Sequence, residues 1–298
     1  MPGVPSIRIL LATYNGDRWL EEQLATLVGQ AGVSASIVAS DDASTDATPA
    51  LLESASRRGD LTLLPPFPEK FGNANRNFLR LIRDTALDDV EYFALSDQDD
   101  LWLPDKLARS VKVLAQTGAD VYSSNVTAFW EDGRRKLLFK SQPQQAFDHL
   151  FESAGPGCTF VFRRAVFVEL QDWVRTNFET LWKIKVHDWL IYSFARERGW
   201  RWTIDASSTL LYRQHERNEA GANTGWRAAV PRIRNILRGH FREDVLAIAA
   251  ATGSKAPLLG RLARMNWRDR VWLALHVRQY RRAFRDRLVL AALFLVMP

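Results

Sequence analysis

The amino-terminal part of the chain alternates short, mostly apolar runs with longer stretches in which apolar residues recur at helical spacing. The short runs lie at residues 7–13, 35–39, 61–64 and 90–95, and the helical stretches lie at 17–30, 47–57, 75–86 and 104–116. Short runs bounded by polar turns are typical of buried strands, whereas the helical period is typical of amphipathic helices. Strands that alternate with helices predict an α/β fold with a doubly wound, mainly parallel sheet flanked by helices.

The pattern becomes less regular after residue 120. The apolar segments 121–130 and 136–140 flank a polar turn, which predicts a hairpin. Further elements are expected as a strand within 155–162, helices at 164–174 and 188–198, a strand pair at 201–204 and 208–212, and helices from residue 224 onward. We therefore expect two regions, an α/β domain at 1–223 and a basic, amphipathic C-terminal helical extension at 224–298.

Polar residues follow three of the predicted strands. Thr13 ends the first strand, Asp41 follows the second, and Ser96-Asp97-Gln98-Asp99-Asp100 follows the fourth. Ligands of open α/β sheets gather beyond the carboxyl ends of the strands, so these residues are expected to line one crevice. Carboxylates clustered in this way favour a hard cation such as Mg²⁺ or Mn²⁺, which can also hold a phosphate. A solvated acidic loop is the alternative.

Other phosphate- and cation-binding loops do not fit the sequence. The turn Tyr14-Asn15-Gly16 lacks the glycine pattern of a dinucleotide-binding fold, and the chain has no Gly-x-x-x-x-Gly-Lys-Ser/Thr segment. An EF-hand that starts at Asp97 fails because Trp102 and Ala108 occupy the positions that need glycine and glutamate. Phosphate is therefore expected to be held through a metal ion.

Composition narrows the class of protein. A chain of 298 residues with 47% hydrophobic residues is ordinary for a globular protein. Its single cysteine, Cys158, excludes an intrachain disulfide framework and a multi-cysteine zinc site. The amino terminus has no positively charged segment ahead of an apolar run, so neither a signal peptide nor an amino-terminal span is indicated. We therefore expect a cytoplasmic location.

The net charge of +6 is distributed unevenly. Residues 1–212 contain 23 Lys and Arg against 28 Asp and Glu, whereas residues 213–298 contain 17 against 6. Such a basic tail favours anionic partners, either phospholipid headgroups or nucleic acid. Its last apolar run, residues 288–297, is shorter than the roughly 20 residues of a membrane-spanning helix. We expect amphipathic helices at the inner face of the cytoplasmic membrane, with a packed terminal helix or a subunit contact as the alternative.

Five motifs occur in one order along the chain. They are Ala12-Thr13-Tyr14-Asn15-Gly16, Ser40 to Asp46, Ser96 to Asp100, His187-Asp188-Trp189 and Tyr212-Arg213-Gln214-His215. Together they resemble the signature of family 2 glycosyltransferases with a GT-A fold, most closely the bacterial rhamnosyltransferases of surface-polysaccharide assembly. The resemblance implies an inverting, metal-dependent transfer of a sugar, possibly rhamnose. The expected donor is a dTDP- or UDP-sugar, and the expected acceptor is a saccharide or a lipid-linked saccharide.

The resemblance also implies which residues bind the nucleotide. Thr13 and Asp41 would contact the nucleoside, with the Asp41 carboxylate accepting the imide N–H of a pyrimidine base. Asp97 would lie near the ribose or the metal, and Arg76 could contact the base or the diphosphate. The alternative for Asp41 and for the residues around Arg76 is a helix cap with solvated polar neighbours.

The metal ligands and the catalytic base follow from the same resemblance. Asp97, Asp99 and His215 would hold Mn²⁺ or Mg²⁺ against the diphosphate, although a histidine in such a sequence is also common on surfaces. Asp188 would accept the proton of the acceptor hydroxyl as a general base, with a helix-capping acid as the alternative. His187 stands where many relatives have an acidic residue, which leaves the tuning of Asp188 open.

Three other functions are compatible with parts of the sequence. A nucleotidyltransferase also combines a doubly wound sheet, paired carboxylates and Mg²⁺, but it usually needs a glycine-rich basic loop after the first strand. A nucleic-acid-binding protein would use the basic tail and leaves the acidic strand ends unexplained. A silent sugar-binding module would retain the carboxylates without purpose. We therefore expect a glycosyltransferase that does not bind nucleic acid.

Overall fold

The computed structural model describes residues 3–215 and 240–297, which form two compact units. The first, here called the sheet unit, comprises the described residues within Met1–Ser141, Gly155–His187 and Trp200–Glu219. The second, called the helical unit, comprises those within Gln142–Ala154, Asp188–Gly199 and Ala220–Pro298. Two segments from the middle of the chain therefore belong with the C-terminal helices. The expected boundary at residues 223 and 224 lies outside the described residues and stays a prediction.

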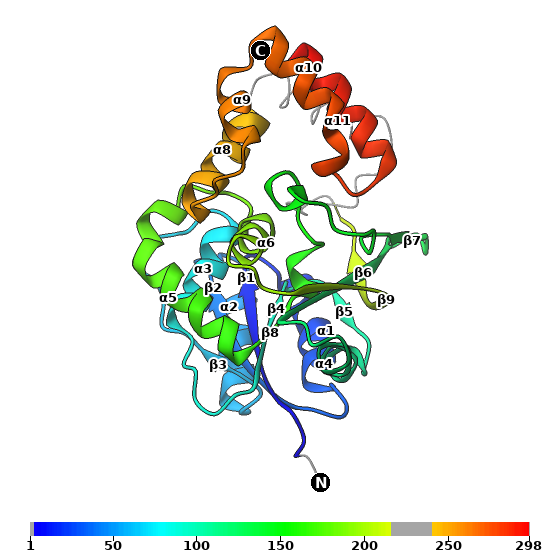
Figure 1. Ribbon diagram of the computed structural model, residues 1–298. Helices are drawn as coiled ribbons and strands as arrows, with labels where there is room; N and C mark the ends of the chain where they lie inside the picture. Colours follow the sequence, from blue (N-terminus) through cyan, green and yellow to red (C-terminus); the bar gives the residue numbers. More distant parts are fainter. Residues whose placement is uncertain (1–2, 216–239, 298) are drawn as a thin grey trace. The chain divides into compact units, whose positions relative to one another are not determined.

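One mixed sheet forms the centre of the sheet unit (Figure 1). Its strands are β1 (Ser6–Thr13), β2 (Ser34–Asp41), β3 (Thr62–Leu63), β4 (Tyr92–Ser96), β5 (Leu101–Trp102), β6 (Val121–Phe129), β7 (Arg135–Leu138), β8 (Val161–Arg163) and β9 (Trp202–Arg213). They follow the order β3-β2-β1-β4-β8-β6-β9-β5, and β7 pairs with β6. The expected parallel pairing is confirmed for β3-β2-β1-β4. The other half is mixed, because β8 is antiparallel to both β4 and β6.

Helices cover both faces of this sheet. They are α1 (Asp17–Val28), α2 (Thr48–Arg57), α3 (Ala74–Asp84), α4 (Lys106–Thr117) and α5 (Arg164–Leu181). Leu20 of α1 and Leu107 of α4 share a buried cluster with Ile9 of β1. Phe93 of β4 stacks instead on Phe167 of α5, with 3.9 Å between the ring centroids. Because both faces are covered, β1 is buried almost throughout, which explains its mostly apolar sequence.

The second half of the sheet differs from the sequence prediction in two places. The predicted hairpin is confirmed as the antiparallel pair β6 and β7. The predicted strand pair at 201–204 and 208–212 is wrong, because these residues form the single strand β9, which runs parallel to β6. The register between the two strands shifts beside Asp205 and Ser208, and this irregularity accounts for the polar break in the apolar pattern. The short strand β5, directly after the acidic loop, pairs with β9 and has no local signal.

The helical unit contains most of α6 (His187–Glu197) and the helices α8 (His240–Thr252), α9 (Leu258–Arg264), α10 (Trp267–Leu275) and α11 (Phe284–Val296). The predicted helical extension is thus confirmed over residues 240–297. Phe151, Tyr280 and Phe294 form an aromatic core, in which the first two rings stack at 4.9 Å. Within residues 3–215 and 240–297, none of the helices has both the length and the apolarity that crossing a membrane requires.

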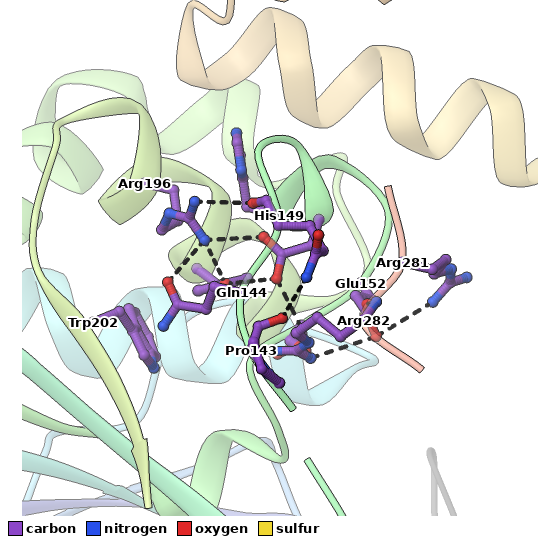
Figure 2. A network of polar contacts seen from close by, with 12 residues as sticks. Pro143, Gln144, His149, Glu152, Arg196, Trp202, Arg281 and Arg282 are labelled. Atoms are coloured by element: carbon purple, nitrogen blue, oxygen red, sulfur yellow. Dashed lines mark hydrogen bonds and ion pairs between the residues drawn. The ribbon is translucent and has the colours of Figure 1, made fainter. Parts of the chain in front are cut away.

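Buried ion pairs join three segments of the helical unit (Figure 2). The carboxylate of Asp148 accepts hydrogen bonds from Arg196 Nη1 at 2.9 Å and from Tyr192 Oη at 3.1 Å. Arg282 Nε lies 3.5 Å from the same carboxylate, and the Arg282 backbone N–H donates to Glu152 Oε1 at 2.7 Å. The segment before α11 is therefore tied to the loop at 148–152 and to α6.

Candidate active site

The carboxyl ends of β1, β2 and β4 meet at one edge of the sheet. Thr13 pairs with Asp41 in the register of β1 and β2, and Leu11 pairs with Ser96 in the register of β1 and β4. The acidic loop 97–100 begins directly after Ser96. The expected convergence of Thr13, Asp41 and the acidic loop on one edge is therefore confirmed.

Asp41 is held in place by its neighbours. Thr13 Oγ1 and Ser44 Oγ donate to Asp41 Oδ1 at 2.9 and 2.6 Å, and the Ser44 backbone N–H donates to Oδ2 at 2.8 Å. The carboxylate thus closes the turn between β2 and α2, but it does not cap α2, whose N-cap is Ala47 without a side-chain cap. A carboxylate has about four lone-pair sites, so this fixed group can still accept an N–H from a ligand.

Asp99 and His215 come from distant parts of the sequence and meet in the structure. His215 Nε2 lies 2.7 Å from Asp99 Oδ2, and the His215 ring stacks on Trp19 of α1 with 3.9 Å between centroids. Arg213, the last residue of β9, donates from Nε to the Asp99 carbonyl at 2.8 Å. Its backbone N–H donates to Asp100 Oδ1 at 3.1 Å. The end of β9 therefore holds both the acidic loop and the histidine.

A second group of possible ligands lies beneath the same loop. One side-chain ligand atom from each of Asp97, Asp100 and Cys158 lies within 4.8 Å of the others. Burial raises the pKa of Asp100 well above its ordinary value, and repulsion from Asp99 and Asp97 raises this pKa further. Burial likewise raises the pKa of Cys158, whose thiol donates to Asp100. Cys158 is thus a protonated partner of the loop.

The donor set of this loop fits a hard divalent cation. Carboxylate oxygens suit both Mg²⁺ and Mn²⁺, and an imidazole nitrogen among them favours the transition metal Mn²⁺. The field of the loop is negative, because Asp97, Asp100 and Asp99 raise the pKa of Tyr212 beyond the effect of its burial, which is the largest cause. A cation would offset this repulsion. The loop is therefore a candidate metal site. Asp99 and His215 contact each other there, whereas Asp97 groups with Asp100 and Cys158, so the ligand set Asp97, Asp99 and His215 stays a prediction.

Arg76 supports the chain before α3. Its Nε donates to the Trp182 carbonyl at 2.9 Å, and its Nη1 donates to the Phe71 carbonyl at 3.0 Å. Asn73 caps α3 by accepting from the Arg76 backbone N–H at 3.0 Å, as the capping alternative expects. These contacts give Arg76 a structural role, and its contact with a nucleotide stays a prediction.

Asp188 is the second residue of α6 and belongs to the helical unit. Its Oδ1 accepts the backbone N–H of Trp189 at 2.7 Å, a contact at the beginning of a helix that suits an acid. The preceding His187 belongs to the sheet unit, where its ring stacks on Phe78 at 4.1 Å. Burial lowers the pKa of His187 to about 3, so its ring is neutral near pH 7. The role of Asp188 as a base stays a prediction.

One residue of the acidic motif, Gln98, and one residue that follows it, Lys106, have contacts that the sequence does not predict. Gln98 exchanges two hydrogen bonds with the backbone of Tyr14, which lies at the end of β1. Lys106 is buried, its ammonium lies 3.4 Å from the centroid of the Trp102 ring, and burial lowers its pKa to about 7. The available signal was their position within or just after the acidic motif.

Comparison with known proteins places this geometry in a family. Residues 8–171 match the model of "Glycosyl transferase family 2". The chain is 38% identical over 288 residues to the dTDP-rhamnosyl transferase RfbG of Shigella flexneri. This match covers 96% of this chain and 99% of that protein. The chain is also 26% identical over 136 residues to the succinoglycan biosynthesis protein ExoO of Rhizobium meliloti, a match that covers 46% of this chain and 37% of that protein.

Solved structures share the fold at low sequence identity. Residues 1–349 of S. aureus TarS in complex with UDP align with a TM-score of 0.55 at 14% identity, over 98% of this chain and 88% of that chain. A mannosyltransferase from Pyrobaculum calidifontis, in complex with GDP-Man and Mn²⁺, aligns with a TM-score of 0.50 at 17% identity, over 98% and 85%. These likenesses confirm the expected GT-A type of α/β fold. With its convergent strand ends and the match over residues 8–171, the chain is a glycosyltransferase and belongs to glycosyl transferase family 2.

Proposed function

We propose that this enzyme transfers rhamnose from dTDP-rhamnose to a saccharide or lipid-linked saccharide during the synthesis of a cell-surface polysaccharide, with inversion at the anomeric carbon. The observation that carries the proposal is the convergence of Thr13, Asp41 and the acidic loop on one sheet edge, with His215 at Asp99. The 38% identity with a dTDP-rhamnosyl transferase over almost the whole of both chains supports the choice of donor.

The nucleoside end of the donor would lie at Thr13 and Asp41. Three donors from Thr13 and Ser44 fix the Asp41 carboxylate before any ligand arrives, so little side-chain entropy is lost on binding. Its remaining acceptor capacity suits the imide N–H of thymine or uracil. Cytosine lacks this N–H, so Asp41 would favour dTDP- and UDP-sugars over a cytidine nucleotide.

The diphosphate would lie beside the acidic loop. Asp97, Asp99 and His215 would hold Mn²⁺ or Mg²⁺, which would neutralise the charge that develops on the departing nucleotide diphosphate. For this, His215 Nε2 must give up its present contact with Asp99 Oδ2 and offer its lone pair. Trp19 and Arg213 keep His215 and the loop in place, so the ligands are held on rigid elements.

Asp188 would act as the general base. Inversion is a single displacement, in which the acceptor hydroxyl attacks the anomeric carbon while its proton passes to a carboxylate oxygen. The neighbouring His187 is uncharged, so it does not form an ion pair with the Asp188 carboxylate. We expect Asp188→Asn to bind dTDP as the wild type does and to lower the turnover number by about 10²–10⁴. Transfer rates within twofold of the wild type would exclude this role.

The donor is tested by thermal unfolding of the full chain with dTDP, UDP and GDP, each with and without Mn²⁺. A ligand at about 100 times its dissociation constant stabilises the folded state by about 2.7 kcal/mol. We expect the largest rise in melting temperature with dTDP and Mn²⁺ together, a smaller rise with UDP, and little with GDP. Equal rises for all three nucleotides, or none, would contradict the proposed donor. Product formation from dTDP-rhamnose and a lipid-linked saccharide, followed by mass spectrometry, then identifies the acceptor.

We further propose that the C-terminal helices bind the surface of an anionic membrane. Residues 240–297 contain 11 Lys and Arg but only 4 Asp and Glu. On α10, Trp267, Val271 and Leu275 are exposed at helical spacing, and on α11, Leu288 and its neighbours are exposed in the same way. Apolar side chains among arginines are typical of helices that lie in a membrane interface. Such a contact would bring the enzyme to a lipid-linked acceptor.

Flotation with lipid vesicles tests the membrane contact. We expect the full chain to float with vesicles that contain phosphatidylglycerol and much less with phosphatidylcholine alone. Leu288→Asp with Leu295→Asp should abolish flotation. Leu137→Asp on β7 is the matched control, because Leu137 is 52% exposed and Leu288 is 57% exposed. Unchanged flotation of the double variant, or no flotation of the wild type, would contradict the proposal.

A further inference from the structure

We propose that Gln98 is a positioning residue that couples the acidic loop at 97–100 to the turn at 14–16, which lies beside the proposed nucleoside site. Through this coupling the cation and the nucleotide would strengthen each other's binding. The inference rests on the proposed function. Gln98 stands between Asp97 and Asp99 in the sequence, and its carboxamide faces the backbone of Tyr14. The Tyr14 N–H donates to Gln98 Oε1 at 2.7 Å, and Gln98 Nε2 donates to the Tyr14 carbonyl at 2.8 Å.

This two-point contact joins two loops that are far apart in the sequence. Tyr14 and Gln98 are 84 residues apart, and they meet because β1 and β4 are neighbours in the sheet. A carboxamide that both donates to and accepts from one residue's backbone fixes the distance and the direction of that segment. A shift of the acidic loop would therefore move the turn after β1, or break both hydrogen bonds.

The other side of the same turn is bonded to the nucleoside edge. The Asn15 N–H donates to Ser44 Oγ at 2.8 Å, and Ser44 in turn donates to Asp41. The Thr45 N–H donates to Asn15 Oδ1 at 2.8 Å. The turn at 14–16 thus lies between Asp41 on one side and Gln98 on the other, which matches the strand order β2-β1-β4.

Gly16 makes room for the contact. A Cβ built on Gly16 would lie 2.3 Å from Gln98 Oε1 and 2.4 Å from Gln98 Cδ. Only glycine allows the carboxamide to lie flat against this turn. Gly16 also donates its N–H to Thr48 Oγ1 at 2.8 Å, so its backbone is fixed from the second side. The close fit shows that the Gln98 side chain is part of the packing of the turn.

The chemistry separates three substitutions. Gln98→Met keeps the length but removes both the donor and the acceptor. Gln98→Glu keeps the acceptor, loses the donor, and adds a charge to a loop that already contains Asp97, Asp99 and Asp100. Gly16→Ala leaves Gln98 intact but displaces its carboxamide. If the contact transmits the effect of the cation, all three should weaken the coupling, because each breaks it at a different atom.

The experiment is calorimetric titration of the full chain with dTDP at zero and at saturating Mn²⁺, and with Mn²⁺ at zero and at saturating dTDP. In the wild type, each ligand should tighten the other by the same factor, as linkage requires. We expect Gln98→Met and Gln98→Glu to lower that factor at least about fivefold, the lower end of typical coupling. Gln116→Met, at an exposed glutamine of α4, is the matched control and should leave it unchanged.

A second readout needs no metal. The amide of Tyr14 should exchange slowly in the wild type and faster in Gln98→Met, because Gln98 Oε1 is the acceptor of that N–H.

Melting temperatures show whether each variant folds. If Gln98→Met does not fold, Gln98→Glu, which is close in shape, takes its place. A coupling factor as large as that of the wild type in folded Gln98 variants would overturn the inference alone. A wild type that shows no effect of Mn²⁺ on dTDP would instead overturn the proposed function.

Discussion

The buried side chain of His187 determines how the stability of the fold responds to pH. His187 is enclosed by Phe78, whose ring centroid lies 4.1 Å away, and by Gly157, where a Cβ would lie 2.3 Å from His187 Nε2. Burial lowers the pKa of His187 from 6.5 to about 3. The glycine at 157 is therefore required by the histidine at 187, although the two are far apart in sequence. Neither residue carries a local signal of this contact.

This burial predicts a pH-dependent stability. Below pH 6.5 the unfolded chain takes up a proton at His187 that the folded chain refuses until about pH 3, so stability falls as the pH decreases through this window. At pH 5 the loss from this group is about 2 kcal/mol relative to high pH. We expect His187→Asn to lose less stability between pH 7 and pH 5 than the wild type does. Urea unfolding at both pH values measures the difference.

The exposed His240 at the beginning of α8 provides the control. His240→Asn should retain the pH dependence of the wild type, because no burial penalty is removed. Equal pH dependence of the wild type and His187→Asn would show that the imidazole is not held in an uncharged form by the fold.

At the scale of elements, the sequence predicts those parts whose burial is continuous. β1 is buried almost throughout and β2 is buried from Ile37 to Ser40, so their apolar segments identify them directly. β5 contains only Leu101 and Trp102 and exists because it pairs with β9, more than 100 residues later. Pairing over such a distance leaves no pattern in a window of a few residues. Thr13, Asp41 and the acidic loop could be placed together because the carboxyl ends of parallel strands lie at one edge of a sheet. The contact of Gln98 with Tyr14 could not be predicted, because it joins residues 84 positions apart.

The loop between β3 and α3 shows how one carboxylate positions an element. Asp42 Oδ2 accepts the Gly72 N–H at 2.8 Å, and Oδ1 accepts the Phe71 N–H. Burial raises the pKa of Asp42, and these two backbone donors oppose that rise. Asp42 therefore acts as a fixed anchor for the loop that leads into α3.

We expect Asp42→Asn to lower the free energy of unfolding by about 1–3 kcal/mol. The amide has one acceptor oxygen where the carboxylate has two, and its NH₂ group would face a backbone N–H from which it cannot accept. Urea unfolding at pH 7 measures the loss. Asp89→Asn, at an exposed aspartate, should change stability by less than about 0.5 kcal/mol. An Asp42→Asn variant as stable as the wild type would mean that water replaces the anchor without cost.

At the scale of the whole molecule, the two units differ in what holds them together. The sheet unit is built around an apolar cluster, whereas the helical unit adds a buried network of charges around Asp148 (Figure 2). The side chains of Asp148 and Arg282 have no exposed surface. A buried pair of this kind gives little net stability when complete, but removing one partner leaves the other charge without compensation. The segment before α11 is therefore required by the same unit that contains Asp188.

This arrangement predicts a large effect from one C-terminal arginine. Arg282→Met should lower the free energy of unfolding of the helical unit by about 3–5 kcal/mol, because Asp148 and Glu152 lose a buried cation. Arg285→Met, at an exposed arginine nearby in sequence, should change it by less than about 0.5 kcal/mol. Urea unfolding followed by tryptophan fluorescence compares the two.

If the prediction holds, deleting the C-terminal helices would remove Arg282 together with the apolar surface of α11, so loss of membrane binding in a truncated chain would also follow from unfolding. Point substitutions such as Leu288→Asp, which leave Arg282 and Asp148 in place, then separate docking from stability. An Arg282→Met variant as stable as Arg285→Met would show instead that the helical unit does not depend on this network.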